Sequence, residues 1–357
     1  MTISDATVET GVSTEAGEKV RDRQSSAVER KDKGHAGPAR WLGVLERYAL
    51  VLVLIAVLLF FSFWSETSST FATAANIRNV LGNQSVSGIL ALAIVIPLVC
   101  GVFDFSVGSV AGLSQVLCAG LMARLGAPVL VAILVAIAVG ALIGLSNGGA
   151  VAKVGVNSII VTLGVSSIAL GFVEWYTNGQ QIIAHLSTHL TQLGTGTWFG
   201  VPQTLYLLVV VALGVYYLLE HTPFGRYVHS IGSNAEAARL VGLPVQRYVL
   251  LCLVLSGTLA GVAGVLLVAR NGGASPQIGT VSDTLQALSA AFLGATAIKP
   301  GRFNVLGTLV AILLLSFTVT GLSLAGVANW INDLFNGAAL FVAVLISTLI
   351  GLKRAGS

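Results

Sequence analysis

Charged side chains are scarce in this sequence. Asp, Glu, Lys and Arg make up 10% of its 357 residues, whereas a soluble domain carries about 25%. Beyond Tyr48, whole stretches contain none of the four, at 105–123, 125–152, 154–173, 248–269 and 303–332. A bilayer span needs about 20 apolar residues, and one charge at its centre costs about 2.5 to 3.5 kcal/mol. The scarcity excludes an aqueous globular protein and predicts an all-α, polytopic bundle of membrane helices.

Motifs for catalysis and for metal binding are missing as well. Cys100, Cys118 and Cys252 stand in apolar stretches, and their spacing fits neither a disulfide framework nor a metal site. His185 and His189 lack the Glu of an H-E-x-x-H motif between them, and no G-x-x-x-x-G-K-[ST] loop for ATP occurs. We therefore predict no catalytic residue, no cofactor and no bound metal, and the chain is not expected to be an enzyme on its own.

Ten apolar segments predict ten spans. They lie at about 44–64, 84–102, 105–123, 128–147, 156–174, 203–220, 247–268, 284–298, 304–324 and 334–352. Residues 1–43 are rich in Ser, Glu, Lys and Gly and lack the apolar core of a signal peptide. They predict a disordered cytosolic tail, followed by a transmembrane domain at 44–352 and a short cytosolic tail at 353–357.

Basic residues gather on one side of the predicted spans. With a cytosolic N-terminus, 16 of the 19 Lys and Arg lie inside, and only Arg78, Arg124 and Arg270 lie outside. This asymmetry predicts that both termini are cytosolic. It also accounts for the formal net charge of +4, which is therefore no sign of nucleic-acid binding.

The longest predicted inner loop, 221–246, carries a helix signal of its own. Ser233 and Glu236 fit a capping box, alanines follow, and Gly242 supplies a left-handed end. A helix of about two turns is marginal alone in water, so we expect it to dock against another protein; a plain surface linker is the alternative. The residues assigned to it are Ser233, Asn234, Glu236, Ala237, Ala238, Arg239 and Gly242.

Asp104 stands between the second and third predicted spans. Its carboxylate can cap the following helix by accepting from backbone donors near Ser106 and Val107. An ionisable residue near membrane depth is also a functional candidate. The sequence leaves a structural cap and a role in solute passage equally open.

Glycine is abundant, with 41 residues, and several stand four or three apart in predicted spans. The pairs are Gly140 and Gly144, Gly257 and Gly261, and Gly261 and Gly264. Small residues let helix backbones approach closely in lipid. We interpret these pairs as packing devices.

Ordered motifs run through most of the chain. They are found at 79–81, 84–91, 104–109, 144–148, 160–164, 177–180, 224–227, 231–234, 237–242, 256–257, 259–261, 269–270 and 274–276. In order and spacing, residues 76–349 resemble the permease subunits of ABC importers for ribose and other monosaccharides. The chain departs from the family pattern at Val102, 281–283 and 299–302, which leaves the sugar open.

The resemblance implies partners and a location. It implies two permeases side by side, identical or not, with cytosolic ABC ATPase subunits and a periplasmic or extracellular sugar-binding protein. It implies a multi-pass protein in the lipid bilayer of a bacterial inner or plasma membrane. On this pattern the helix near 233–242 is the coupling helix that seats in the ATPase.

A neutral polyol needs hydrogen bonds rather than ion pairs along its path. The candidate pathway residues are Gln84, Ser87, Asp104, Ser106, Ser114, Gln115, Asn157 and Thr162; each also has the option of a partner in its own or a neighbouring helix. Two alternative functions remain. An ion-coupled secondary transporter would favour charged groups in the spans and an inverted repeat, and a permease for branched-chain amino acids would favour a charged partner for its solute.

Overall fold

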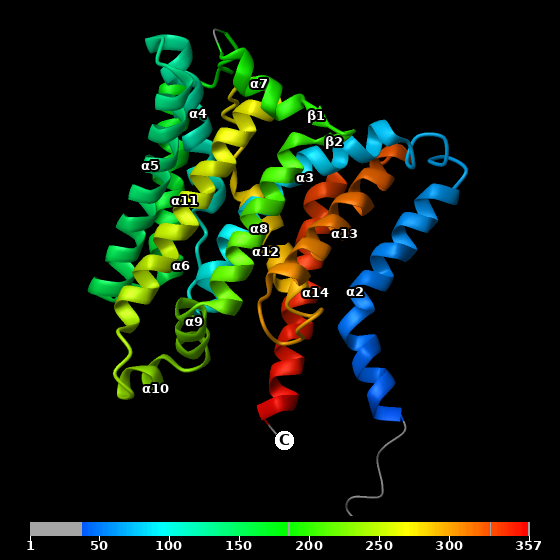
Figure 1. Cartoon of the computed structure of the whole chain (residues 1–357), viewed down its shortest axis with the longest axis vertical. Coiled ribbons are helices and arrows are strands. Elements are labelled where there is room, and N and C mark those ends of the chain that lie inside the picture. The colour runs from blue at the N-terminus through cyan, green and yellow to red at the C-terminus, as the bar shows by residue number, and fades with distance from the viewer. Residues whose placement is uncertain (1–37, 185, 329, 356–357) are drawn as a thin grey trace, which may run out of the picture. The chain divides into compact units, whose positions relative to one another are not determined.

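The structure is a computed structural model that describes residues 38–184, 186–328 and 330–355. The chain divides into two units, Met1–Glu46 and Arg47–Ser357, and the contacts given below lie within the second. In order, the elements are α2 Pro38–Phe63, α3 Ala74–Val99, α4 Val107–Leu125, α5 Val129–Gly148, the π-helix η1 Gly149–Val154, α6 Ser158–Thr177, α7 Thr188–Thr195, β1 Thr197–Trp198, β2 Val201–Pro202, α8 Gln203–His221, α9 Pro223–Ser233, α10 Ala235–Leu240, α11 Val245–Asn271, α12 Val281–Gly294, α13 Val305–Leu324 and α14 Trp330–Ala355 (Figure 1).

The helices coincide with the predicted spans. Each of the ten predicted segments overlaps one of α2, α3, α4, α5, α6, α8, α11, α12, α13 and α14. Seven helices of the described ranges are long and apolar enough to cross a membrane: α3, α4, α5 with η1, α6, α8, α11 and α13. The predicted all-α membrane bundle is confirmed, while the count of ten spans stays a prediction. The helix α2 begins at Pro38, inside the range predicted as a tail, and residues 1–37 lie outside the described part.

Three helices form the interior of the bundle. The most apolar window of α3 is 78% buried, that of α4 is 72% buried and that of α11 is 61% buried, against 22% for α5 and α6. The exposed apolar side chains of the outer helices face the surroundings that lipid would fill, since a span has no need to hide them. Buried polar side chains lie on α4 and α11, at Ser109, Ser114, Gln115 and Ser256, and also on α12 and α13, at Thr284, Ser289, Thr308 and Ser316.

Close packing between α5 and α11 depends on glycine. A Cβ atom added to Gly140 would overlap the carbonyl oxygen of Gly257, and one added to Gly257 would overlap that of Gly140. Likewise, a Cβ atom on Gly261 would lie 2.9 Å from the Cα atom of Ile137. The predicted packing role of these glycines is confirmed, because no larger side chain fits between the two backbones.

Residues predicted to share a side of the membrane meet at one end of the bundle. At the end that carries α9 and α10 (Figure 1), the backbone N–H of Ile298 donates to the Arg47 carbonyl at 2.9 Å. Lys299 pairs there with Glu220 at 2.5 Å. At the opposite end, Arg124 donates to the carbonyl of Tyr176 at 3.0 Å. Which end faces the cytosol stays a prediction.

Candidate functional site

The segment after α8 forms two short helices at one end of the bundle. Thr222 caps α9: its hydroxyl accepts from the backbone N–H of Gly225 at 3.3 Å and donates to the carbonyl of Leu218 at 2.6 Å. A Cβ atom on Gly225 would overlap the carbonyl of Leu219, so α9 folds directly back against the last turn of α8. This tight turn fixes the direction in which the following helix starts.

The second short helix, α10, begins one residue later than predicted. Asn234, not Ser233, is its N-cap, and the Asn234 side chain accepts from the backbone N–H of Ala237 at 2.9 Å. The predicted Ser233–Glu236 capping box is wrong because α9 continues through Ser233. Glu236 instead pairs with Arg239 at 3.2 Å. The predicted left-handed end at Gly242 is confirmed by its φ of 83°.

The surface of α10 is open on one side and anchored on the other. Ala238 is buried and belongs to the main apolar core. Leu240 and Val241 are 89% and 78% exposed, and the Glu236–Arg239 ion pair is also exposed. A six-residue helix with a buried alanine and exposed apolar and charged groups is suited to docking against a second protein.

Contact with α9 reaches the end of α3. A Cβ atom added to Gly232 would overlap the carbonyl oxygen of Val99, and one added to Gly101 would lie 3.4 Å from the Cα atom of Gly232. The backbone of α9 therefore lies directly on the residues that begin the α3–α4 connection. Any movement of α9 toward the bundle must displace this connection.

Asp104 lies in that connection and is 1% exposed. Its Oδ1 atom accepts from the backbone N–H of Ser106 at 3.0 Å and from the Ser106 hydroxyl at 2.6 Å. Its Oδ2 atom accepts from the hydroxyl of Ser256, on α11, at 2.7 Å. The side chain of Asn147, on α5, donates to the Ser106 hydroxyl at 2.9 Å. This buried cluster, Asp104–Ser106–Asn147–Ser256, joins the connection to two helices that follow it in the chain.

The predicted capping role of Asp104 is wrong, because α4 has Ser106 as its N-cap residue and no side-chain cap hydrogen bond. The backbone N–H of Ser106, which does donate to Asp104, precedes the helix. The other partners of Asp104 are the hydroxyl groups of Ser106 and Ser256. Asn147 and Ser256 are not among the residues that the sequence predicts for a site. The available signal was their polar character in apolar spans and their position inside the family motifs at 144–148 and 256–257.

Two further ties hold the α3–α4 connection against α6. The backbone N–H of Phe105 donates to the Thr162 hydroxyl at 3.0 Å, and that of Phe103 donates to the Ser158 hydroxyl at 3.3 Å. Thr162, a candidate pathway residue, thus accepts from the protein backbone. Of the eight candidates, the structure brings together Asp104, Ser106 and Thr162.

The remaining candidates lie apart from this cluster. Ser114 donates to the carbonyl of Ala136 at 3.1 Å. The side chain of Gln115 donates to the carbonyls of Ser275 and Ile278 at 2.9 and 2.8 Å. Three candidates are less enclosed: Asn157 is exposed and caps α6, and Ser87 and Gln84 are half-buried on α3. Their assignment to a solute pathway stays a prediction.

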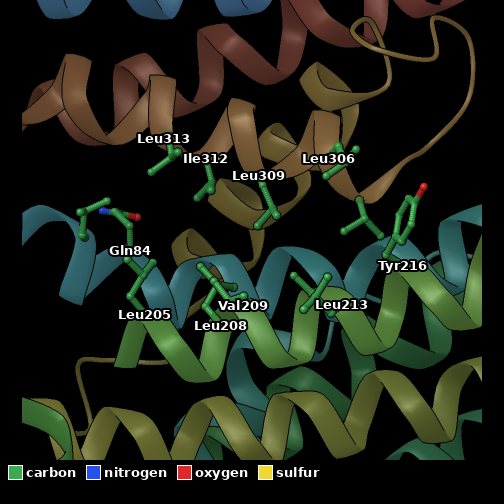
Figure 2. Close-up of a pocket in the computed structure, with 13 residues that line it drawn as sticks. Gln84, Leu205, Leu208, Val209, Leu213, Tyr216, Leu306, Leu309, Ile312 and Leu313 are labelled. Carbon is green, nitrogen blue, oxygen red and sulfur yellow. The ribbon is translucent and has the colours of Figure 1, made fainter. Parts of the chain in front are cut away.

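Gln84 lies at one end of an apolar groove of about 600 Å³ between α3, α8 and α13 (Figure 2). Tyr216 lies toward the other end, and aliphatic side chains of α8 and α13 face each other along the groove (Figure 2). The Gln84 Oε1 atom has no hydrogen-bond partner among the described residues. A groove with so few polar groups offers little to a polyol. The same ranges contain no group of three or more His, Cys, Asp or Glu that would hold a metal ion, and His185 lies outside them.

Comparison with known proteins gives the family. Residues 76–344 match the model of a family described as the permease component of a branched-chain amino acid transport system. The chain belongs to this permease family. The ribose import permease of Escherichia coli strain K12 is 33% identical over 312 residues, which cover 86% of this chain and 94% of that protein. The ribose import permease of Bacillus subtilis strain 168 is 31% identical, with coverage of 85% and 93%.

A permease named for a different solute matches as well. The autoinducer 2 import system permease LsrD of Yersinia enterocolitica is 35% identical over 273 residues, which cover 75% of this chain and 81% of that protein. No solved structure matches the chain. Together with the apolar helices, the family shows a multi-pass membrane protein that is the permease component of an ABC importer. The predicted class is confirmed over the ion-coupled transporter.

Proposed function

We propose that this permease imports a monosaccharide or a related small polyol. The observation that carries the proposal is the likeness, over most of both chains, to two permeases named for ribose import. The candidate residues support it, since seven of the eight carry an uncharged amide or hydroxyl group in or beside the spans, and such groups form hydrogen bonds with a neutral solute. The family description names branched-chain amino acids, which makes a zwitterionic solute the second candidate.

The partners follow from what this chain lacks. It has no P-loop, so ATP hydrolysis belongs to separate cytosolic ATPase subunits, and an external binding protein delivers the solute. A second permease completes the translocation path. In the described chain, both carboxylate oxygens of Asp104 and the amide nitrogen of Gln115 bind partners within the protein, while the Gln115 Oε1 and Asn147 Oδ1 atoms are buried without a partner among the described residues. The groove beside Gln84 is apolar. We therefore place the polar path between two permease copies, in the inner membrane, with both termini cytosolic.

Movement enters the permease through α10. Its exposed Leu240, Val241 and Glu236–Arg239 pair form the contact with the ATPase. A push on α10 displaces α9, whose Gly232 lies against Val99. The displaced α3–α4 connection carries Asp104, and this carboxylate moves α5 and α11 with it. A buried, hydrogen-bonded cluster transmits such a displacement as a unit, because breaking it would leave polar groups without partners.

Reconstituted transport tests the proposed solute. The full-length permease, its ATPase and its binding protein are placed in proteoliposomes, and uptake of labelled ribose and labelled leucine is measured with ATP inside. We expect ATP-dependent ribose uptake and no leucine uptake. Uptake of leucine alone would establish the second candidate. Uptake driven by an ion gradient without the ATPase would contradict both.

A further inference from the structure

A second cavity, of about 400 Å³, lies beside α9 and away from the Asp104 cluster. Its wall combines the end of α8, one face of α9 and the connection between α12 and α13. The polar groups in this wall are Glu220, Arg226, His229, Ser230, Lys299 and Arg302. A neighbouring cavity of about 420 Å³ shares His229, Ser230 and Arg302 with it. The neighbouring cavity is also lined by Val99 and Gly232 of the transmission path, whereas the 400 Å³ cavity contains neither of them.

The wall of this cavity carries an excess of positive charge. Three cations, Arg226, Lys299 and Arg302, and one carboxylate, Glu220, line the cavity, which leaves two positive charges in excess. Lys299 is paired with Glu220 at 2.5 Å. No carboxylate of the described residues lies within 4.0 Å of the Arg226 or Arg302 guanidinium. Arg226 and Arg302 are both exposed at the cavity, so their guanidinium groups are accessible to an anion.

His229 adds a hydrogen-bonding group to the wall of the same cavity. Burial lowers the pKa of its imidazole; nearby Arg302 and Lys299 lower it further, and Glu220 opposes them. The ring is thus neutral near pH 7 and presents one donor and one acceptor. Guanidinium groups match the oxygens of a phosphate in bidentate pairs, and a ring N–H beside them supplies a further donor.

The place of the cavity in the fold suits a phosphate at a membrane surface. The helix α8 ends at His221 and α13 begins at Val305, so the cavity lies where two apolar helices leave the bilayer. Arg47 adds another cation nearby: its Nε atom donates to the carbonyl of Ile298, next to Lys299, at 2.9 Å. A basic residue near a membrane surface contributes about 1 kcal/mol to the attraction of anionic lipid.

We propose that this cavity binds a phosphate group, which Arg226 and Arg302 hold while His229 donates a hydrogen bond to it. Lys299 and Glu220 form its rim as a fixed ion pair. The phosphate belongs either to the headgroup of an anionic lipid or to a free phosphate in the cytosol; both offer the same oxygens. The site is independent of the proposed solute, and its loss leaves the family assignment untouched.

Lipid retention tests the first source. The full-length permease is assembled in nanodiscs of phosphatidylcholine with or without phosphatidylglycerol, and retained lipids are counted by native mass spectrometry after delipidation. We expect one retained phosphatidylglycerol, with retention about fivefold weaker in Arg226→Gln and in Arg302→Gln, which corresponds to about 1 kcal/mol for each arginine. Arg247→Gln is the matched control, because Arg247 is exposed near the same end but does not line the cavity.

Titration with inorganic phosphate in phosphatidylcholine nanodiscs tests the second source. Saturable binding by the wild type that is lost in the Arg226→Gln/Arg302→Gln double variant would support a free phosphate. Specific lipid retention without such binding would support a headgroup. Equal lipid retention and equal phosphate binding in the wild type and the double variant would overturn the site, as would an equal loss in the Arg247→Gln control.

Discussion

Reversing the charges of Glu236 and Arg239 on α10 distinguishes a role in docking to the ATPase from a role in stabilising the fold. The Glu236 and Arg239 side chains are 81% and 55% exposed and lie 3.2 Å apart. An exposed pair of this kind contributes about 0.2 to 1 kcal/mol, so its loss has little effect on the folded bundle. If these side chains contact the ATPase, the same change turns their electrostatic attraction to it into repulsion. We therefore expect Glu236→Lys and Arg239→Glu to leave expression and melting temperature nearly unchanged and to abolish ATP-driven uptake.

The double variant Glu236→Arg/Arg239→Glu is the sharper test. It keeps an ion pair within α10 but reverses the charges that face outward. It also places a positive charge in the first turn of α10 and a negative charge in the last turn. Both charges then interact unfavourably with the helix dipole, and in a long helix each such interaction costs about 0.3 to 1 kcal/mol. If the pair only stabilises α10, the double variant transports; if the pair contacts the ATPase, it does not.

Two measurements are made in parallel on each variant. Uptake into proteoliposomes reports transport, and co-purification of the ATPase with the permease reports assembly. The expected result is loss of both in all three variants, with unchanged thermal unfolding. Normal uptake by the double variant would refute the coupling role of this pair. Gly171→Ala serves as a neutral reference, because its added Cβ atom meets nothing within 4 Å.

Three further predictions follow from the interior and from the pH dependence. Ser256→Ala removes a hydrogen bond to the buried Asp104 and should cost about 1.5 to 3 kcal/mol, measured as a lower unfolding temperature in detergent; an unchanged temperature would contradict the cluster. Gly257→Ala would force α5 and α11 apart and cost about 1 to 3 kcal/mol, whereas Gly171→Ala, on an exposed helical face, should be neutral or stabilising. Because the pKa of His229 lies below its ordinary value of 6.5, the folded protein holds fewer protons than the unfolded chain as pH falls below about 6.5, and stability should fall there. His229→Gln should remove this part of the pH dependence in thermal unfolding, and an identical profile would contradict the prediction.

The part of the fold that could be predicted rests on local composition. A charge-free stretch of about 20 residues predicts a span wherever it stands, so each predicted segment overlaps a helix. Gly140 and Gly257 were predicted as packing residues for a similar reason, since glycine in a span has few other uses. The ordered motifs at 76–349 gave the permease class without any structure.

The error at Ser233 shows where local reasoning fails. Ser233 fits a capping box by sequence, but packing of Gly225 on Leu219 and of Gly232 on Val99 holds α9 in helical form through Ser233. The cap therefore passes to Asn234. A helix boundary between two short helices is decided by what they pack against, which the local sequence does not contain.

The sequence by itself determined that this chain is a charge-poor helical permease with a short helix in the loop after the span at 203–220; that this helix is cytosolic and docks against a partner stays a prediction. Only the tertiary structure decided which polar groups meet. Ser106 is hydrogen-bonded to Asn147, which lies 41 residues away in the sequence, and Asp104 is hydrogen-bonded to Ser256, which lies 152 residues away. The basic cavity is lined by residues of both α9 and the α12–α13 connection. The physical reason is the sequence distance over which each interaction acts. Whether a segment spans the membrane depends on the transfer free energies of its own side chains from water to lipid, whereas a buried hydrogen bond depends on which distant helices pack together.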